Sequence, residues 1–227
     1  TGPAFPHSQH ISDIRKQCTA ASIPMIFDID DLVFAPQLCT PDLIDGLRSM
    51  NESERQQYIT GIHGYQRTLE LCDLVNCSTT TLHTYITQTY HKPCIITRNA
   101  LDERYESALH LPPKQHLDSK VTIGYTPGSR THQKDFREVY PALTMILETH
   151  PKAHLHILGE LDLTDYPELL NRYTNQVSHD KRLGRELVYS FQSQIDINIV
   201  PLEQHNIFTA SKSELKYFEA AAFGVPT

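Results

Sequence analysis

The sequence predicts an α/β protein that contains two doubly wound parallel sheets. Short apolar runs alternate with segments of helical periodicity along most of the chain. Apolar strands in such an alternation are typical of parallel sheets whose two faces are both covered by helices. A polar, proline-containing and aperiodic stretch at residues 101–120 interrupts the alternation. We therefore expect two domains, at residues 1–105 and 121–227, joined by a linker at residues 106–120.

Composition narrows the class of protein. The 227 residues suffice for one large domain or two small ones, and 39% hydrophobic with 21% charged residues is ordinary for a soluble globular protein. The net charge of −7 argues against a nucleic-acid partner. No apolar run reaches the roughly 20 residues that cross a bilayer, and the first residues lack the pattern of a signal peptide. The five cysteines form no C-x-x-C pair, so we interpret them as reduced thiols and expect a cytoplasmic protein.

In the first domain, each expected strand is a short apolar run and each expected helix repeats its apolar residues every three or four positions. The strands are expected at residues 23–29, 73–78 and 94–100, and the helices at 10–22, 55–72 and 80–90.

The same criteria give the elements of the second domain. Strands are expected at residues 121–129, 153–160 and 195–203, and helices at 136–147, 163–173 and 212–224. Pro141 must lie in the first turns of its helix or kink it. Ser211 and Glu214 form an S-x-x-E capping box that would start the last helix.

Ligands of open α/β sheets bind at the carboxyl ends of the strands, so the polar residues there are candidates for a site. The run "DIDD" places Asp28, Asp30 and Asp31 at the end of the first expected strand. These carboxylates could hold a divalent metal that bridges to a diphosphate. Alternatively, one of them caps the next turn and the others are solvated.

The loop at residues 124–136 combines two glycines, a proline and two cations, and contains Gly128, Arg130 and Lys134. This composition suits a loop whose backbone N–H groups approach phosphate oxygens. A solvated loop is an equally good interpretation of the spacing alone.

The last expected helix carries charges at defined positions. Lys212 and Ser213 would lie in its first turn, where a lysine and unpaired N–H groups attract an anion. Glu219 lies about two turns further and could accept hydrogen bonds from two sugar hydroxyls. By contrast, His154 and His156 alternate with apolar residues, which favours a solvated strand face over a metal site.

The segment "SELKYFEAAAFGVP" resembles the donor-site helix of GT-B glycosyltransferases, especially the large group with sucrose, trehalose-phosphate and mannosyl transferases. Further resemblances follow in the family's order: "IPMIFDIDDL", "CDLVNCSTTTL", "IITRNALD", "VTIGYTPGSRTHQKDF" and "HLHILGE". The resemblance covers residues 23–227. It implies two Rossmann-like domains that face each other across a cleft, each of them partial when compared with the family.

The resemblance also implies roles for individual residues. Glu219 would hold the donor ribose, and Lys134 and Lys212 would contact the diphosphate. Ser213, Arg130 and Gly128 would complete the donor site. Asp30 stands where many members carry a histidine, and we expect it to orient or deprotonate the acceptor hydroxyl.

Two positions depart from the family's pattern. The first glutamate of its paired motif would fall at Ser211, and Arg98 replaces a proline before Asn99. The segment from Asn99 to Asp102 is expected to be structural.

The function that the resemblance implies is transfer of a sugar from a nucleoside diphosphate sugar to a glycan or lipid-linked acceptor, as in polysaccharide biosynthesis. Neither a cofactor nor a metal is expected, because lysines would stabilise the departing diphosphate. Peripheral contact with a membrane and membership of a longer multidomain chain are compatible with this. One alternative is a non-catalytic module that acts as a scaffold or binds nucleotide sugars. Another is a metal-dependent transferase of the GT-A type built on residues 28–31.

Overall fold

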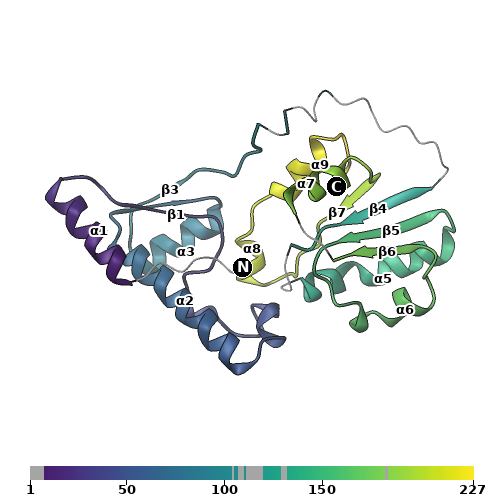
Figure 1. Cartoon of the computed structure of the whole chain (residues 1–227), viewed down its shortest axis with the longest axis horizontal. Coiled ribbons are helices and arrows are strands. Elements are labelled where there is room, and N and C mark those ends of the chain that lie inside the picture. Colours follow the sequence, from purple (N-terminus) through teal and green to yellow (C-terminus); the bar gives the residue numbers. More distant parts are fainter. Residues whose placement is uncertain (1–7, 104, 107–109, 111–119, 129–131, 182–183) are drawn as a thin grey trace. The chain divides into compact units, whose positions relative to one another are not determined.

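The computed structural model describes residues 8–103, 105–106, 110, 120–128, 132–181 and 184–227. Arg130 and most of the expected linker lie outside these residues. Contacts divide the chain into two compact units. Unit 1 is Thr1–Asn99 with Gln204–Ser213, and unit 2 is Ala100–Glu203 with Glu214–Thr227. Each unit contains one parallel sheet with helices, as expected for an α/β protein (Figure 1).

Unit 1 holds a three-stranded sheet in the order β1-β2-β3. The strands are β1 (Ile26–Ile29), β2 (Leu74–Cys77) and β3 (Cys94–Ile96), and both pairings are parallel. They confirm the three strands expected in this part of the chain, in shorter form. The helices of unit 1 are α1 (Ser8–Ala20), α2 (Glu52–Leu71), α3 (Thr80–Tyr90) and α8 (Ile207–Ala210), with the 3-10 turns η1 (Pro36–Leu38) and η2 (Asp45–Arg48).

The start of α2 shows how local sequence sets a boundary. The side chain of Asn51 accepts a hydrogen bond from the backbone N–H of Glu54, and the Glu54 carboxylate accepts one from the N–H of Asn51. This reciprocal capping satisfies two N–H groups that the first turn leaves without helical partners. The helix therefore begins three residues before the expected position 55, at Glu52.

The two faces of the unit 1 sheet differ. Phe27, Val75 and Cys77 lie on one face and are buried in a core that α3 also lines. On the other face, Ile26 remains 52% exposed and Ile95 48% exposed. The expectation that both faces are covered is therefore wrong for the described part of unit 1.

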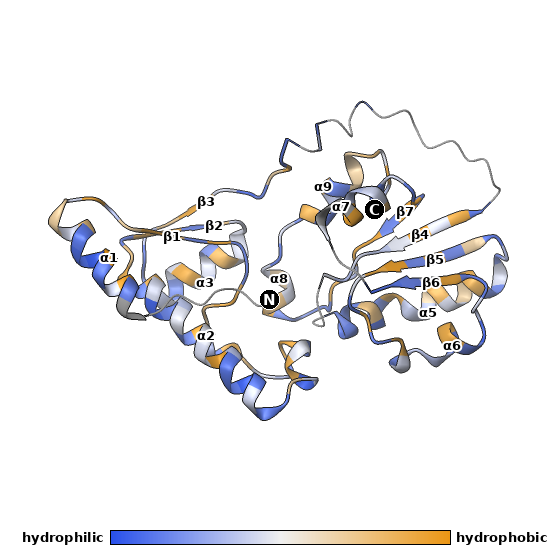
Figure 2. Cartoon of the chain, in the orientation of Figure 1, coloured by the Kyte–Doolittle hydropathy of each residue, from blue (hydrophilic) through white to orange (hydrophobic). Residues whose placement is uncertain are grey.

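Unit 2 holds a four-stranded parallel sheet in the order β6-β5-β4-β7. The strands are β4 (Val121–Tyr125), β5 (Ala153–Leu158), β6 (Val177–Asp180) and β7 (Ile197–Ile199). The helices are α5 (Gln133–Thr149), α6 (Pro167–Asn171), α7 (Arg185–Gln192) and α9 (Leu215–Ala221), with the 3-10 turn η3 (Leu163–Asp165). The sequence analysis missed β6 and α7. Figure 2 shows why β6 is hard to detect, because it is hydrophilic whereas the end of β5 is apolar.

Both faces of the unit 2 sheet are covered. Ile123, Leu155 and Ile157 pack in a core that includes residues of α5. The opposite face meets α7 and the turn after it, since a side-chain carbon built on Gly124 would lie 3.0 Å from Phe191 of α7 and 2.5 Å from Ile195, which follows the helix. A glycine in β4 therefore allows α7 to approach the strand closely. None of the described helices is long and apolar enough to cross a membrane.

Pro141 lies in the middle of α5, beyond its first turns, so the first of the two expectations for it is wrong and a kink stays a prediction. The expected start of the last helix also needs correction. Ser211 does not start the last helix. It ends α8 as its C-cap, where its hydroxyl donates to the carbonyl of Ile207 at 2.7 Å, and the last helix begins only at Leu215. Glu214, with φ −80° and ψ 17°, precedes α9 without a capping side chain.

Candidate functional site

An open pocket of about 350 Å³ lies within unit 2, and we call it the α9 pocket. Its volume is in the range of small-molecule sites. Apart from Tyr105, which precedes β4, the residues that line it follow β4, lie on or just before α7, or lie on α9: Thr126, Gly128, Gly184, Val188, Lys216 and Glu219. Because Thr126 and Gly128 come directly after β4, the pocket lies at the carboxyl end of that strand, where open α/β sheets bind ligands.

Glu219 is the acidic group of this pocket. Its Oε1 accepts a hydrogen bond of 3.0 Å from the hydroxyl of Tyr105. Tyr105 is buried, and its ring packs against Tyr189 and Phe223 at centroid distances of 5.8 and 6.2 Å. The phenol therefore holds the carboxylate in a defined orientation. A carboxylate has about four acceptor positions, so Glu219 can accept further hydrogen bonds from a ligand.

Lys216 is the basic group of the α9 pocket, and the sequence analysis missed it. Its Nζ donates to the backbone carbonyl of Thr126 at 2.7 Å. Lys216 and Glu219 are three positions apart on α9, so both project from the same side of the helix. Because the sequence placed the start of the helix at Ser211, it predicted Lys212 as the lysine of the first turn. A start at Leu215 would have identified Lys216 as a residue of the first turn.

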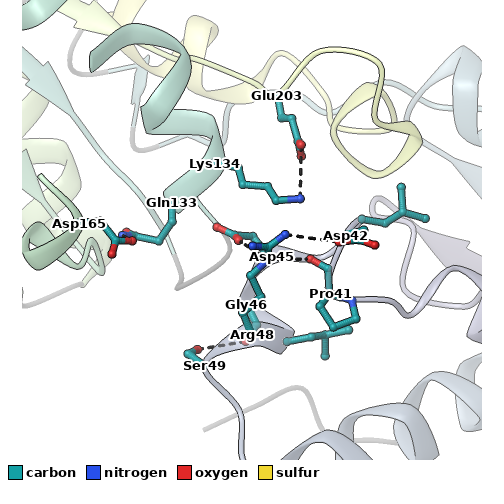
Figure 3. Close-up of polar contacts among 12 residues, drawn as sticks. Pro41, Asp42, Asp45, Gly46, Arg48, Ser49, Gln133, Lys134, Asp165 and Glu203 are labelled. Atoms are coloured by element: carbon teal, nitrogen blue, oxygen red, sulfur yellow. Dashed lines mark hydrogen bonds and ion pairs between the residues drawn. The ribbon is translucent and has the colours of Figure 1, made fainter. Parts of the chain in front are cut away.

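The glycine loop contributes only in part to the described site. Gly128 lines the α9 pocket and has open space where a side chain would be, so a ligand can approach its backbone. Lys134 lies on α5, where its Nζ is 3.4 Å from Glu203 Oε1 (Figure 3). Its side chain is 15% exposed. Lys134 is not among the described residues that line the α9 pocket.

Of the three aspartates, Asp28 lies in β1 and Asp30 and Asp31 follow it. Asp28 accepts a hydrogen bond from the Asn76 amide at 2.7 Å. Asp31 accepts one from the N–H of the next residue, Leu32, at 2.9 Å. Asp30 is exposed. In the described residues no three His, Cys, Asp or Glu side chains are grouped so as to hold a metal ion.

Lys212 and Ser213 also belong to unit 1. The ammonium of Lys212 lies 3.6 Å from Asp31 Oδ2 and 4.7 Å from the centroid of the Phe208 ring. The hydroxyl of Ser213 accepts a hydrogen bond from the Asn99 amide at 2.8 Å. Neither residue lies in the first turn of a helix, contrary to the expectation. Their part in binding a donor stays a prediction.

The two histidines of β5 are half-buried, so the expectation of a solvated strand face is wrong. His154 Nε2 is 2.9 Å from the hydroxyl of Ser178 on β6. Burial, together with the positive charge of Lys120, lowers the pKa of His154 to about 4. The ring of His156 packs against Phe191 of α7 at 4.9 Å, and its pKa is also lowered, chiefly by burial.

Comparisons with known proteins bear on the fold. No family model matches the sequence, and no curated protein matches it. Among solved structures, the sucrose-phosphate synthase of Thermosynechococcus elongatus is similar, with a TM-score of 0.50 and 12% sequence identity. The match covers 96% of this chain and 58% of that one, so this chain spans less than two thirds of its neighbour. At this identity the likeness shows the α/β fold alone.

Proposed function

We propose that the protein is a glycosyltransferase and that the α9 pocket holds its nucleoside diphosphate sugar. The observation that carries the proposal is the pair of Glu219 and Lys216, which lie one turn apart and line one pocket at the carboxyl end of β4. A carboxylate is suited to two ribose hydroxyls, and an ammonium is suited to a diphosphate. The structural neighbour, a sucrose-phosphate synthase, agrees with this class of reaction.

The residues take separate roles in this proposal. Glu219, oriented by Tyr105, accepts hydrogen bonds from the ribose. Lys216 and the open backbone at Gly128 bind the diphosphate and stabilise the charge that develops as it departs. Lys134, Arg130, Lys212 and Ser213 are proposed as further donor contacts. Asp30, exposed after β1, is proposed to orient or deprotonate the acceptor hydroxyl of a glycan or lipid-linked substrate. The proposed reaction uses no metal.

Calorimetric titration with uridine, guanosine and adenosine diphosphates and with the free nucleosides tests the donor site. Hydrogen bonds to charged groups contribute about 1.5–3 kcal/mol, or roughly ten- to a hundredfold in affinity. Lys216→Ala should weaken the diphosphate by that factor and leave the nucleoside nearly unchanged. Glu219→Gln should weaken both ligands alike, because both contain the ribose.

The control is Tyr217→Ala, which alters α9 at a residue that is 51% exposed and does not line the pocket. It should bind as wild type does. The proposal is wrong if no nucleoside diphosphate binds, or if Lys216→Ala retains the wild-type affinity.

One observation favours the alternative of a non-catalytic binding module. Ser211 stands where the resembled family has the first glutamate of its pair, and it is fully buried. Its hydroxyl donates to Ile207 and its carbonyl accepts from Thr79, so it offers nothing to a transferred sugar. Release of diphosphate from nucleotide sugars in the presence of acceptors separates the two functions. Tight binding of a nucleotide sugar without any release of diphosphate would favour the non-catalytic module.

A further inference from the structure

A second pocket, of about 440 Å³, lies at the end of the unit 2 sheet where β4 and β5 begin, and we call it the amino-end pocket. Lys120 directly precedes β4, and Lys152 and His154 flank the first residue of β5. The N–H of Val121 donates to the carbonyl of Lys152 at 3.0 Å, which keeps the two lysines on neighbouring strands. The α9 pocket follows the carboxyl end of β4. The two pockets are therefore separate sites at opposite ends of the same strand.

The amino-end pocket is rich in hydrogen-bond donors. Lys120, Lys152, His154 and Asn175 supply two ammonium groups, an imidazole and an amide, and no carboxylate is among the described residues that line it. Gln176 is already engaged, because its amide donates to the carbonyls of Leu147, His150 and Ala153. Two cations without an acidic neighbour in the lining are notable in a chain of net charge −7. This chemistry favours an anion.

His154 lies beside the pocket and can report on its occupation. One ring nitrogen, Nε2, is 2.9 Å from the hydroxyl of Ser178. The other, Nδ1, is buried and has no hydrogen-bond partner among the described residues. Because this nitrogen is not exposed to the pocket, an anion bound there acts on the ring through its charge and not through a hydrogen bond.

We propose that the amino-end pocket binds the phosphate group of a small metabolite. Lys120 and Lys152 bind the phosphate oxygens, and the ring of His154, which lines the pocket, lies beside the bound group. Asn175 contacts the remainder of the molecule, for which a pocket of about 440 Å³ leaves room. The site is distinct from the proposed donor site and does not depend on it.

The test uses the full chain with two probes, inorganic phosphate and glycerol phosphate. NMR of the histidine rings should show that either probe shifts the Nδ1 resonance of His154. Calorimetry should show that Lys120→Ala with Lys152→Ala weakens this binding at least tenfold, since two charge-assisted contacts are lost. Tighter binding of glycerol phosphate than of inorganic phosphate would support a phosphate monoester as the ligand, and equal binding would overturn the assignment to a metabolite in favour of the free ion.

The matched control, Lys16→Ala with Lys181→Ala, removes the same charge from exposed positions that do not line the pocket. It should bind both probes as wild type does. If both double variants bound the probes equally weakly, the effect would be due to overall charge, and the proposed site would be wrong. An unshifted His154 resonance at saturating phosphate would overturn it as well.

Discussion

The imidazole of His154 is neutral near pH 7 because its surroundings oppose its protonation. Burial among the strands of unit 2 is the largest cause, and the nearby charges of Lys120 and His156 act in the same direction. Together they lower the pKa of His154 to about 4, whereas a histidine in an unfolded chain titrates near 6.5. The folded and unfolded states therefore bind different numbers of protons between these two values.

This difference predicts a pH-dependent contribution to stability. Between about pH 6.5 and pH 4 the unfolded chain binds a proton at His154 that the folded protein does not bind, so the free energy of unfolding decreases as the pH falls. Above about pH 6.5 the contribution is complete and constant. His154→Gln should lose less stability on acidification than wild type. Urea unfolding at pH 4.5 and pH 7.5 in phosphate-free buffer measures this, and parallel decreases in the two proteins would contradict it.

At the scale of elements, the contact between α7 and β4 depends on one missing side chain. An added carbon at Gly124 would lie 2.5 and 2.7 Å from two carbons of Ile195. Such distances do not occur between real side chains, so Ile195, which follows α7, would have to move, and so would Phe191 of α7, whose ring would lie 3.0 Å from the added carbon. Since α7 also supplies Val188 to the α9 pocket, a shift of the helix would reach the candidate site.

Gly124→Ala should therefore destabilise the protein by about 1–3 kcal/mol, the usual cost of overpacking a core. Gly128→Ala is the matched control, because an added carbon there has no neighbour within 4 Å. Its free energy of unfolding should stay within about 0.5 kcal/mol of wild type, as for most exposed changes. Equal stability of both variants in chemical unfolding would show that α7 adapts without cost.

The sequence analysis predicted the strands that have an apolar run and missed β6, which has none; it also missed α7, although apolar residues recur with helical spacing along that helix. β1 to β5 and β7 each contain an apolar run, whereas β6 consists of Val177 followed by Ser178, His179 and Asp180. At the candidate site, Glu219 and Gly128 were predicted from the resemblance of their segments to a known family. Lys216 could be predicted only if the start of α9 was placed correctly. The contact of Tyr105 with Glu219 joins positions 114 residues apart, which no local pattern can reveal.

At the scale of the whole molecule, the chain passes from one unit to the other three times. It leaves unit 1 after Asn99, returns for Gln204–Ser213, and continues into unit 2 at Glu214. The returning segment is part of the unit 1 interior. Phe208 is buried in the same core as β1 and α3, and the Asn206 amide donates to the carbonyl of Leu43 at 2.9 Å.

Transfer activity is predicted to persist in excess chelator. In the proposed mechanism the ammonium of Lys216, with the backbone near Gly128, takes the place of a divalent cation at the diphosphate. Transfer from a nucleotide sugar should be measured with and without EDTA, and with manganese added afterwards. Loss of activity in EDTA that manganese restores would contradict the prediction and favour a metal site at Asp28, Asp30 and Asp31.

The returning segment has a consequence for the order of events on the ribosome. Domains usually fold as they emerge, with the N-terminal one first. Here unit 1 obtains Phe208 only after every strand of both sheets has been translated. Until then, the apolar surface that Phe208 covers stays open in the nascent chain. Unit 2 waits in the same way, because its last segment, Glu214–Thr227, follows the returning segment in the chain. Both units are therefore completed only when the last residues of this sequence have been made, and neither can finish folding before most of the other has been synthesised.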